Sequence, residues 1–277
     1  MVGLSKKLFV PRDTGACSLG ANQVASKLEH HFKSHDIPIE VVRNGSRGLY
    51  WLEPLVEIET TLGRVAYGPI SIDDVDDFIS QSCWEINTSH PKHLGLTEEI
   101  AFLSRQQRVT FSKVGLIDPL SIDDYRHHHG FVGLKKALAL TPQDIVTAVS
   151  ESGLRGRGGA AFPTGIKWQT VLDANANQKY IVCNADEGDS GTYSDRMLME
   201  GDPFSLVEGM IIAGLAVNAS RGYIYLREEY PLAHEVLNEA LSIAKKSNHL
   251  GENILDSGKC FDIEIRLGAG AYICGEE

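Results

Sequence analysis

The feature that most constrains the fold is a regular alternation of helix-like and strand-like segments through the second half of the chain. Apolar residues recur at helical spacing in some segments and form short buried runs in others. The helix-like segments are 141–153, 165–175, 202–219 and 231–247, and the strand-like segments are 179–188, 221–230 and 261–277. Strands joined by helices of this length predict a mostly parallel sheet with helices on both faces. Ligands of such sheets bind beyond the carboxyl ends of the strands.

Composition excludes several classes of protein. The chain has 277 residues and is 43% hydrophobic, which suffices to bury the core of one large domain or two ordinary ones. The net charge of −11 and the pI near 5.4 argue against a general binder of nucleic acid or anionic membranes. No window approaches the roughly 18 apolar residues of a membrane span, and the first apolar run is too short for a signal peptide. We expect a cytoplasmic protein without a membrane span that binds no nucleic acid.

The cysteines give no metal-binding pattern. Cys17, Cys83, Cys183, Cys260 and Cys274 lie far apart, and no two of them form a CxxC pair. Such spacing suits a reducing compartment and offers neither a zinc site nor a cluster loop. We therefore predict no metal site in this chain.

The chain divides into three parts by pattern. Residues 1–80 predict a strand, a helix, a second strand, a hairpin around TTLGR and a short acidic helix, which together form a small α/β domain. Residues 81–140 follow a looser pattern, which indicates a connector with short helices. Residues 141–277 carry the regular alternation and form the larger domain.

A glycine-rich stretch, SGLRGRGGAAFPTGIKW at residues 152–168, stands before the second helix of the larger domain. Glycines allow several backbone N–H groups to turn toward one anion, and the helix that follows adds a favourable dipole. Arg155, Arg157 and Lys167 supply positive charge, and Phe162 offers a face on which a ring can stack. The stretch predicts a phosphate cradle. A flexible connector is the alternative, since neither a Walker loop nor a GxGxxG pattern is present.

Acidic and amide side chains follow the next predicted strand, in CNADEGDSGTYSDR. Asn184, Asp186, Glu187 and Asp189 fall within six residues at the point where the strand ends. Carboxylates and amides in this position accept hydrogen bonds from ribose or ribityl hydroxyls and from ring N–H groups. An acidic turn and a metal site are the alternatives.

A third segment, GAGAYICGEE at residues 268–277, is again rich in glycine and again follows a predicted strand. Because parallel strands end at one edge of a sheet, all three segments are expected to meet there. Three loops of this character predict a nucleotide of some length.

These three segments resemble the signature stretches of the flavin-binding subunit of respiratory complex I and its relatives, over about residues 141–277. Those relatives include the diaphorase subunit of NAD-reducing hydrogenases and the β subunit of soluble molybdenum-dependent, NAD-linked formate dehydrogenases. The form NADEGDSGT and the N-terminal phrases FVPRDTGACSLGA, VRNGSRGLYWLEPLVE and GRVAYGPIS most resemble the formate dehydrogenase subunit. The resemblance implies a Rossmann-like FMN-binding domain.

The resemblance also implies a site. FMN lies in the cleft, NAD(H) stacks on its isoalloxazine ring, and hydride passes directly between the two, so that no catalytic residue is needed. The positions that match flavin contacts of the family are Gly156, Gly158, Lys167, Asn184, Asp186, Glu187, Tyr272, Gly275 and Glu276. The positions that match NAD(H) contacts are Gly159, Phe162, Lys167, Asp189 and Glu277. Asp189 stands where complex I relatives have a glutamate.

Two departures from the family are visible. The family continues beyond the GEE motif with more flavin contacts and with cysteines that bind a [4Fe–4S] cluster, and this chain contains none of them, so we expect a C-terminally truncated domain. Residues 1–80 resemble the thioredoxin-like, [2Fe–2S] ferredoxin type of domain, whose cluster needs four thiolates. This segment offers only Cys17. We expect it to serve in docking.

The leading hypothesis is an oxidoreductase subunit, the diaphorase subunit of an NAD-linked formate dehydrogenase. Its partners would be an iron–sulfur ferredoxin-like subunit and a molybdenum catalytic subunit. The first alternative is the equivalent subunit of complex I or of an NAD-reducing hydrogenase. An alternative of another class is a non-catalytic docking or assembly module with a vestigial nucleotide site, and a third is a nucleotide-binding enzyme that takes ATP.

Overall fold

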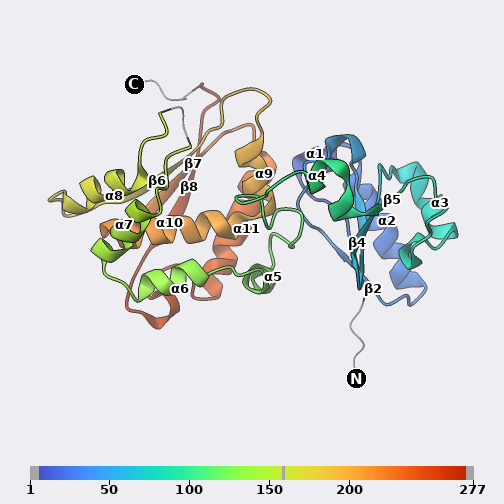
Figure 1. Cartoon of the computed structure of the whole chain (residues 1–277), viewed down its shortest axis with the longest axis horizontal. Helices are drawn as coiled ribbons and strands as arrows, with labels where there is room; N and C mark the ends of the chain where they lie inside the picture. The colour runs from blue at the N-terminus through green and yellow to red at the C-terminus, as the bar shows by residue number, and fades with distance from the viewer. Residues whose placement is uncertain (1–5, 158–159, 273–277) are drawn as a thin grey trace. The chain divides into compact units, whose positions relative to one another are not determined.

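The computed structural model describes residues 6–157 and 160–272. Its contacts divide the chain into two compact units. Unit 1 consists of Met1–Pro119 with Glu200–Asp202, and unit 2 consists of Leu120–Met199 with Pro203–Glu277. Each unit is built around a sheet of its own (Figure 1).

Unit 1 contains a mixed sheet in the order β2-β1-β3-β4-β5. Its strands are β1 (Lys6–Phe9), β2 (Ile39–Val42), β3 (Val56–Thr60), β4 (Gly63–Tyr67) and β5 (His93–Leu96). β1 pairs parallel with β2, whereas the other neighbouring pairs are antiparallel. The strand, helix, strand and hairpin predicted for this part are confirmed. β5 is a correction, because it lies in the segment predicted to be a connector yet extends the sheet.

Helices complete unit 1. They are α1 (Thr14–Ser18), α2 (Ala21–Ser34), α3 (Val75–Ser80) and α4 (Ala101–Ser104), with 3₁₀ turns η1 (Tyr50–Leu52), η2 (Ile72–Asp74), η3 (Cys83–Glu85) and η4 (Thr97–Glu99). Leu28 of α2, Ile58 of β3 and Phe78 of α3 are fully buried in one hydrophobic cluster, so these elements share a core. A β-α-β unit followed by a hairpin and a helix is the thioredoxin-like arrangement, as the sequence predicted.

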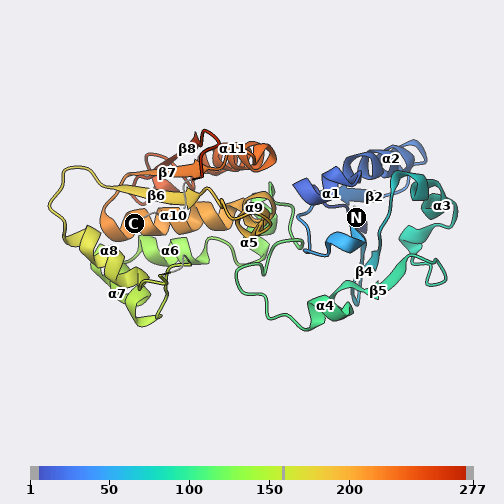
Figure 2. The same cartoon turned by 90° about the horizontal axis from the view of Figure 1, so that it is seen from above.

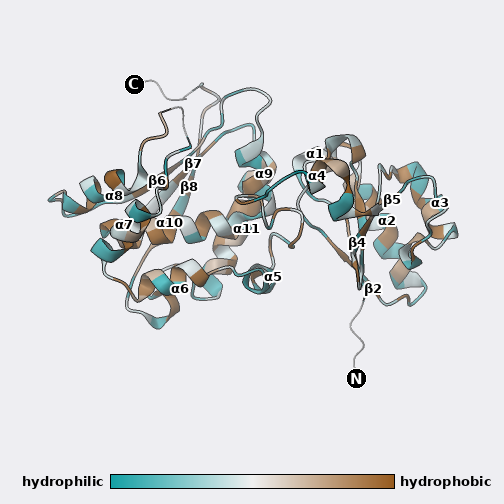
Figure 3. Ribbon diagram, in the orientation of Figure 1, coloured by the Kyte–Doolittle hydropathy of each residue, from teal (hydrophilic) through white to brown (hydrophobic). Residues whose placement is uncertain are grey.

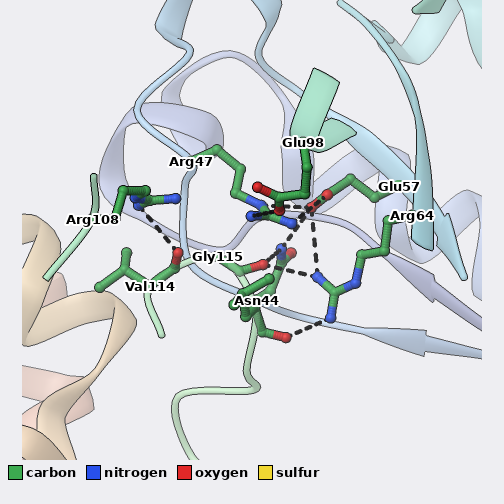
Figure 4. Close-up of polar contacts among 9 residues, drawn as sticks. Asn44, Arg47, Glu57, Arg64, Glu98, Arg108, Val114 and Gly115 are labelled. Atoms are coloured by element: carbon green, nitrogen blue, oxygen red, sulfur yellow. Dashed lines mark hydrogen bonds and ion pairs between the residues drawn. The ribbon is translucent and has the colours of Figure 1, made fainter. Parts of the chain in front are cut away.

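Unit 1 also holds a buried polar network (Figure 4). Arg47 Nη2 donates to Glu57 Oε1 at 2.8 Å, and both side chains are almost completely buried. Asn44 Nδ2 and Arg64 Nη1 both donate to the carbonyl oxygen of Gly115, at 2.7 and 2.9 Å. A buried charge needs a partner and hydrogen bonds to be tolerated. The network supplies both, and it binds the segment around Gly115 to the sheet of unit 1.

Unit 2 is built on a parallel sheet in the order β6-β7-β8. The strands are β6 (Tyr180–Ala185), β7 (Arg221–Leu226) and β8 (Asp262–Leu267). The helices are α5 (Ile122–His127), α6 (Val132–Leu138), α7 (Pro142–Glu151), α8 (Thr164–Asp173), α9 (Ser194–Gly201), α10 (Pro203–Val217) and α11 (Pro231–Lys246), with a 3₁₀ turn η5 (Ile254–Asp256). The predicted parallel α/β architecture is confirmed.

The helices of unit 2 cover its sheet unevenly. α10 packs against β6 and β7, and α11 packs against β8 (Figure 2). α10 is largely apolar, as its brown and white colouring in Figure 3 indicates, because it also contacts α6, α7 and α8. On β6, Tyr180 and Val182 remain 51% and 66% exposed. In the described residues one face of this strand is thus uncovered, whereas the sequence predicted helices on both faces of the sheet.

Local signals set the ends of several helices. Thr141 and Asp144 form a reciprocal capping box at the start of α7, followed by a proline that needs no hydrogen-bond partner for its nitrogen. Glu208 of α10 accepts hydrogen bonds from the backbone nitrogens of Phe131 and Leu134, both at 2.8 Å, and so satisfies the first turn of α6. Among the described residues, no helix combines the length and apolarity needed to cross a membrane.

Candidate functional site

The carboxyl ends of the three parallel strands form one edge of unit 2. Ala185, Leu226 and Leu267 are aligned by the register at the ends of β6, β7 and β8. The segment before α8 rises on this same side of the unit, where the chain also leaves β8 (Figure 1). All three segments singled out in the sequence therefore approach one edge, the position at which open parallel sheets bind ligands.

The glycine-rich segment forms a closed loop before α8. The backbone nitrogen of Gly156 donates to the carbonyl oxygen of Phe162 at 2.8 Å, and that of Thr164 donates to the carbonyl oxygen of Leu154 at 2.9 Å. Arg155 Nε donates to the carbonyl oxygen of Ala161 at 2.7 Å. Backbone bonds at its base therefore hold the loop against the start of the helix. Two of the predicted contact residues, Gly158 and Gly159, lie outside the described residues.

Lys167 occupies the first turn of α8, directly after this loop. Its Nζ lies 5.9 Å from the ring centroid of Phe162, which is 44% exposed. The free N–H groups and the dipole of the helix attract an anion at this end, and the ammonium adds a full charge. The structure thus brings together a cation, a helix N-terminus and an aromatic face.

Gly165 allows α8 to approach α7 closely. A Cβ at this position would lie 2.7 Å from Cα of Ser150 and 2.1 Å from its Oγ, and neither distance is sterically allowed. Only glycine fits without displacing one helix. Since the glycine-rich loop joins these two helices, their close packing sets the position of the loop.

The acidic segment after β6 makes several local hydrogen bonds. Asn184 Oδ1 accepts a hydrogen bond from the backbone nitrogen of Asp186 at 3.1 Å. Asp186 is only 4% exposed, whereas Asn184 and Asp189 are exposed at the edge. The exposed amide and carboxylate are available to hydroxyl or N–H donors of a ligand.

Glu187 is engaged by the protein itself. Its carboxylate accepts from Ser194 Oγ at 3.0 Å, from the backbone nitrogens of Asp195 at 2.7 Å and Arg196 at 3.1 Å, and from the Tyr230 hydroxyl at 2.9 Å. These donors include the N-terminal N–H groups of α9, so Glu187 caps that helix. Burial, followed by the hydrogen bond to Glu187, raises the pKa of Tyr230 to about 12.

Two of the three segments are directly connected. The Tyr272 hydroxyl donates to Asp189 Oδ1 at 3.1 Å across 83 residues of sequence. Tyr272 is 70% exposed, so its ring and hydroxyl remain accessible to a ligand. The other predicted residues of the last segment, Gly275, Glu276 and Glu277, lie outside the described residues.

The sequence analysis missed the contribution of the segment after β7. Arg227 donates from its backbone nitrogen to the carbonyl oxygen of Ala185 at 3.1 Å and from Nη1 to that of Glu187 at 2.7 Å. Tyr230 adds its hydroxyl to the Glu187 carboxylate. The signal was present in the sequence, because the second strand-like segment, 221–230, ends in the polar residues REEY, as the first ends in acidic residues.

The chemical types of the groups at this edge match the parts of FMN and NAD(H). A Cβ on Gly156 would lie 3.7 Å from Lys167 Nζ, so the glycine leaves open the space beside the ammonium that a phosphate needs. Asn184 and Asp189 are suited to hydroxyl and ring N–H groups, and Phe162 to a stacked ring. In the part of the chain that the structure describes, no three histidine, cysteine or acidic side chains are grouped so that they could hold a metal ion.

Comparison with known proteins identifies the class of this domain. Residues 149–277 match the family Complex1_51K, described as the Nuo51 FMN-binding domain. This match falls on the region that carries the three segments, and it agrees with the resemblance inferred from them.

Particular relatives are similar over 157 to 173 residues of this chain. The NADP-reducing hydrogenase subunit HndC of Solidesulfovibrio fructosivorans is 54% identical over 173 residues, which cover 62% of this chain and 35% of the relative. One NADH-quinone oxidoreductase subunit, that of Aquifex aeolicus, is 49% identical over 157 residues, covering 57% and 37%. Its counterpart in Escherichia coli is 48% identical over 161 residues, covering 57% and 36%. The chain thus spans little more than a third of these relatives.

Two solved structures are similar to this chain at lower identity. An NAD⁺-reducing [NiFe]-hydrogenase in the air-oxidised state is 24% identical with a TM-score of 0.47, over 100% of this chain and 45% of that one. A variant of the thioredoxin-like [2Fe–2S] ferredoxin from Aquifex aeolicus is 15% identical with a TM-score of 0.29, over 32% of this chain and 98% of that one.

Proposed function

We propose that this chain is the FMN- and NAD(H)-binding part of an NADH dehydrogenase or diaphorase type of oxidoreductase. One observation carries the proposal: three chemically matched segments converge on the carboxyl edge of a parallel sheet, within a segment that matches the Nuo51 FMN-binding domain. Ligand recognition at this edge follows from the general behaviour of open parallel sheets.

Each segment has a distinct task in this proposal. The loop glycines Gly158 and Gly159 present backbone N–H groups to phosphate, Gly156 leaves space for it beside the helix, and Lys167 neutralises its charge. Phe162 provides a stacking surface for a planar ring. The residues proposed to accept hydrogen bonds from ligand hydroxyl and N–H groups are Asn184, Asp186, Asp189, Glu276 and Glu277, and Gly275 is a further proposed flavin contact. Glu187 and Tyr272 position the same edge.

The protein contributes geometry to the reaction. FMN, when bound, supplies the hydride exchange with nicotinamide and the release of single electrons. The residues at the edge hold two planar rings in contact, and precise placement by itself lowers the barrier of such a transfer. In this proposal no side chain of the chain has to move a proton.

Which complex this domain serves is a finer proposal. The relatives described above are named as subunits of an NADP-reducing hydrogenase and of NADH-quinone oxidoreductase. These names favour the hydrogenase and complex I alternatives over a formate dehydrogenase, for which the N-terminal phrases are the support. We accordingly propose that the chain works with other redox subunits, among them an iron–sulfur ferredoxin-like subunit. A molybdenum subunit is the partner only if formate is the substrate.

FMN binding tests the proposal. Titration of the purified protein with FMN, followed by quenching of flavin fluorescence, is expected to show saturable binding that Lys167→Ala weakens at least about tenfold, because a charge-assisted phosphate contact is lost. Lys136→Ala is the matched control, since this exposed lysine lies on α6 away from the edge. NADH is then expected to bleach the bound flavin.

The docking alternative predicts another result. A vestigial site would leave the protein colourless after reconstitution with FMN, while a stable complex with a redox partner would still form. That pair of results would overturn the proposal. Equal FMN affinities of parent and Lys167→Ala would show that the loop and its lysine do not hold the phosphate.

A further inference from the structure

Two histidines lie side by side at the C-terminal end of α2 in unit 1. His31 and His35 are four residues apart, which places them on one face of the helix. Their ring centroids are 4.3 Å apart and their planes differ by 32°. Two imidazoles with this spacing on a helix are the arrangement that chelates transition metals in helical metal sites.

Each ring is held in place by a different contact. His35 Nδ1 lies 2.9 Å from the carbonyl oxygen of His31 and 3.0 Å from Ser34 Oγ. In the tautomer with the proton on Nδ1, this nitrogen donates to the carbonyl oxygen and Nε2 keeps its lone pair. A metal-binding histidine commonly donates its other ring nitrogen to a carbonyl in this way. His31 packs on Trp84, with centroids 5.6 Å apart.

The position on the helix favours a cation as well. The last four carbonyl groups of a helix have no partner within it, and together they carry about half a negative charge. α2 has 14 residues, and His31 lies in its last turn, with His35 as the C-terminal cap. A divalent ion held between the two rings would therefore lie at the end of the helix that attracts positive charge.

We propose that His31 and His35 form a two-imidazole chelate for a divalent transition cation of the Zn²⁺, Ni²⁺ or Cu²⁺ type. Imidazole prefers these ions to Mg²⁺ and Ca²⁺. Two protein ligands leave the other coordination positions to water or to a ligand from another chain, which agrees with the finding that no group of three metal-binding side chains occurs in the described residues. The two histidines belong to unit 1, whereas the strand edge proposed to bind FMN belongs to unit 2.

Ni²⁺ is the probe that tests this site. Untagged protein is titrated with NiCl₂ by calorimetry at pH 7.5, in a background where His127, His128 and His129 are replaced by asparagine. His31→Gln and His35→Gln are each expected to weaken binding at least about tenfold, because each removes one arm of the chelate. His30→Gln is the matched control, since the neighbouring residue points about 100° around the helix. Mg²⁺ is expected not to bind.

Two outcomes of the Ni²⁺ titration would overturn the proposal. One is an unchanged Ni²⁺ affinity in His31→Gln, and the other is an equal loss in His30→Gln. Because His35→Gln also removes a helix cap, a measurement on the unmutated ligand pair is added: electron paramagnetic resonance of bound Cu²⁺ is expected to show two nitrogen ligands. A single nitrogen would contradict the chelate.

Discussion

Arg47 has two carboxylate partners in unit 1 that differ in burial and in the number of donors they serve, so the pair tests what holds this unit together. Glu57 also accepts from Asn44 Nδ2 at 3.3 Å and lies 3.7 Å from Arg64 Nη1. Glu57 is fully buried and its Oε1 lies 2.8 Å from Arg47 Nη2. Glu98 lies 2.7 Å from Nη1 of the same arginine, but its side chain is 64% exposed. Burial lowers the pKa of Arg47, yet attraction to Glu57 and Glu98 outweighs this and holds it above its ordinary value.

The two substitutions Glu57→Gln and Glu98→Gln remove one negative charge each and keep the side-chain shape. Losing Glu57 leaves a guanidinium that is 2% exposed without its buried counter-ion, a change that typically costs about 3–5 kcal/mol. Losing an exposed partner at similar distance costs about 0.2–1 kcal/mol, because water replaces it. We therefore expect a difference of at least about 2 kcal/mol in the free energy of unfolding between the two variants.

Urea unfolding measured by tryptophan fluorescence tests this difference. Trp168→Phe removes the one tryptophan of unit 2, so that Trp51 and Trp84 report on unit 1. In 1 M NaCl the small effect of Glu98→Gln is expected to shrink further, while that of Glu57→Gln persists, since salt screens exposed charges more than buried ones. Equal losses in the two variants, or a loss below about 1 kcal/mol in Glu57→Gln, would refute the reasoning.

Three further predictions concern pH, packing and capping. Burial raises the pKa of Glu53 to about 8 from an ordinary 4.5. The stability that this raised pKa contributes is present below pH 4.5 and is lost as pH rises toward 8. Glu53→Gln is expected to remove this decrease in stability with pH, measured as urea midpoints from about pH 5 to 8. Gly165→Ala is expected to cost about 1–3 kcal/mol of stability through overpacking against α7 and so to lower the thermal midpoint. Gly209→Ala, where a Cβ meets open space, is expected to raise the midpoint slightly. Glu187→Gln is expected to speed amide hydrogen exchange at residues 195–196 by weakening the cap of α9, and unchanged exchange there would contradict the capping role.

Much of the fold was predictable because its signals are local. The 3.6-residue and two-residue periods of apolar side chains depend on neighbours along the chain, and they predicted the strands and helices of both units. β5 was missed because HLGL is short and half-buried throughout, with no alternation to separate it from a loop. It becomes a strand through its pairing with β4, which a local pattern does not contain.

The candidate site divides in the same way. The glycines, the lysine and the acidic segment were visible as residue types with a known affinity for phosphate and hydroxyl groups, and parallel strands implied that they meet at one edge. The partners of each side chain were not visible. Glu187 was predicted to contact flavin, and only the structure shows its carboxylate bound to the start of α9 and to Tyr230, which lies 43 residues away in sequence.

The sequence by itself determined the order and type of the elements and the chemical character of the edge, because these depend on residue identity and short-range spacing. The tertiary structure decided which atoms face each other: Tyr272 with Asp189, Arg47 with Glu57, and His31 with Trp84. The physical reason is that hydrogen bonds and ion pairs act over a few ångströms, and distant residues come within that range only after the hydrophobic cores have packed.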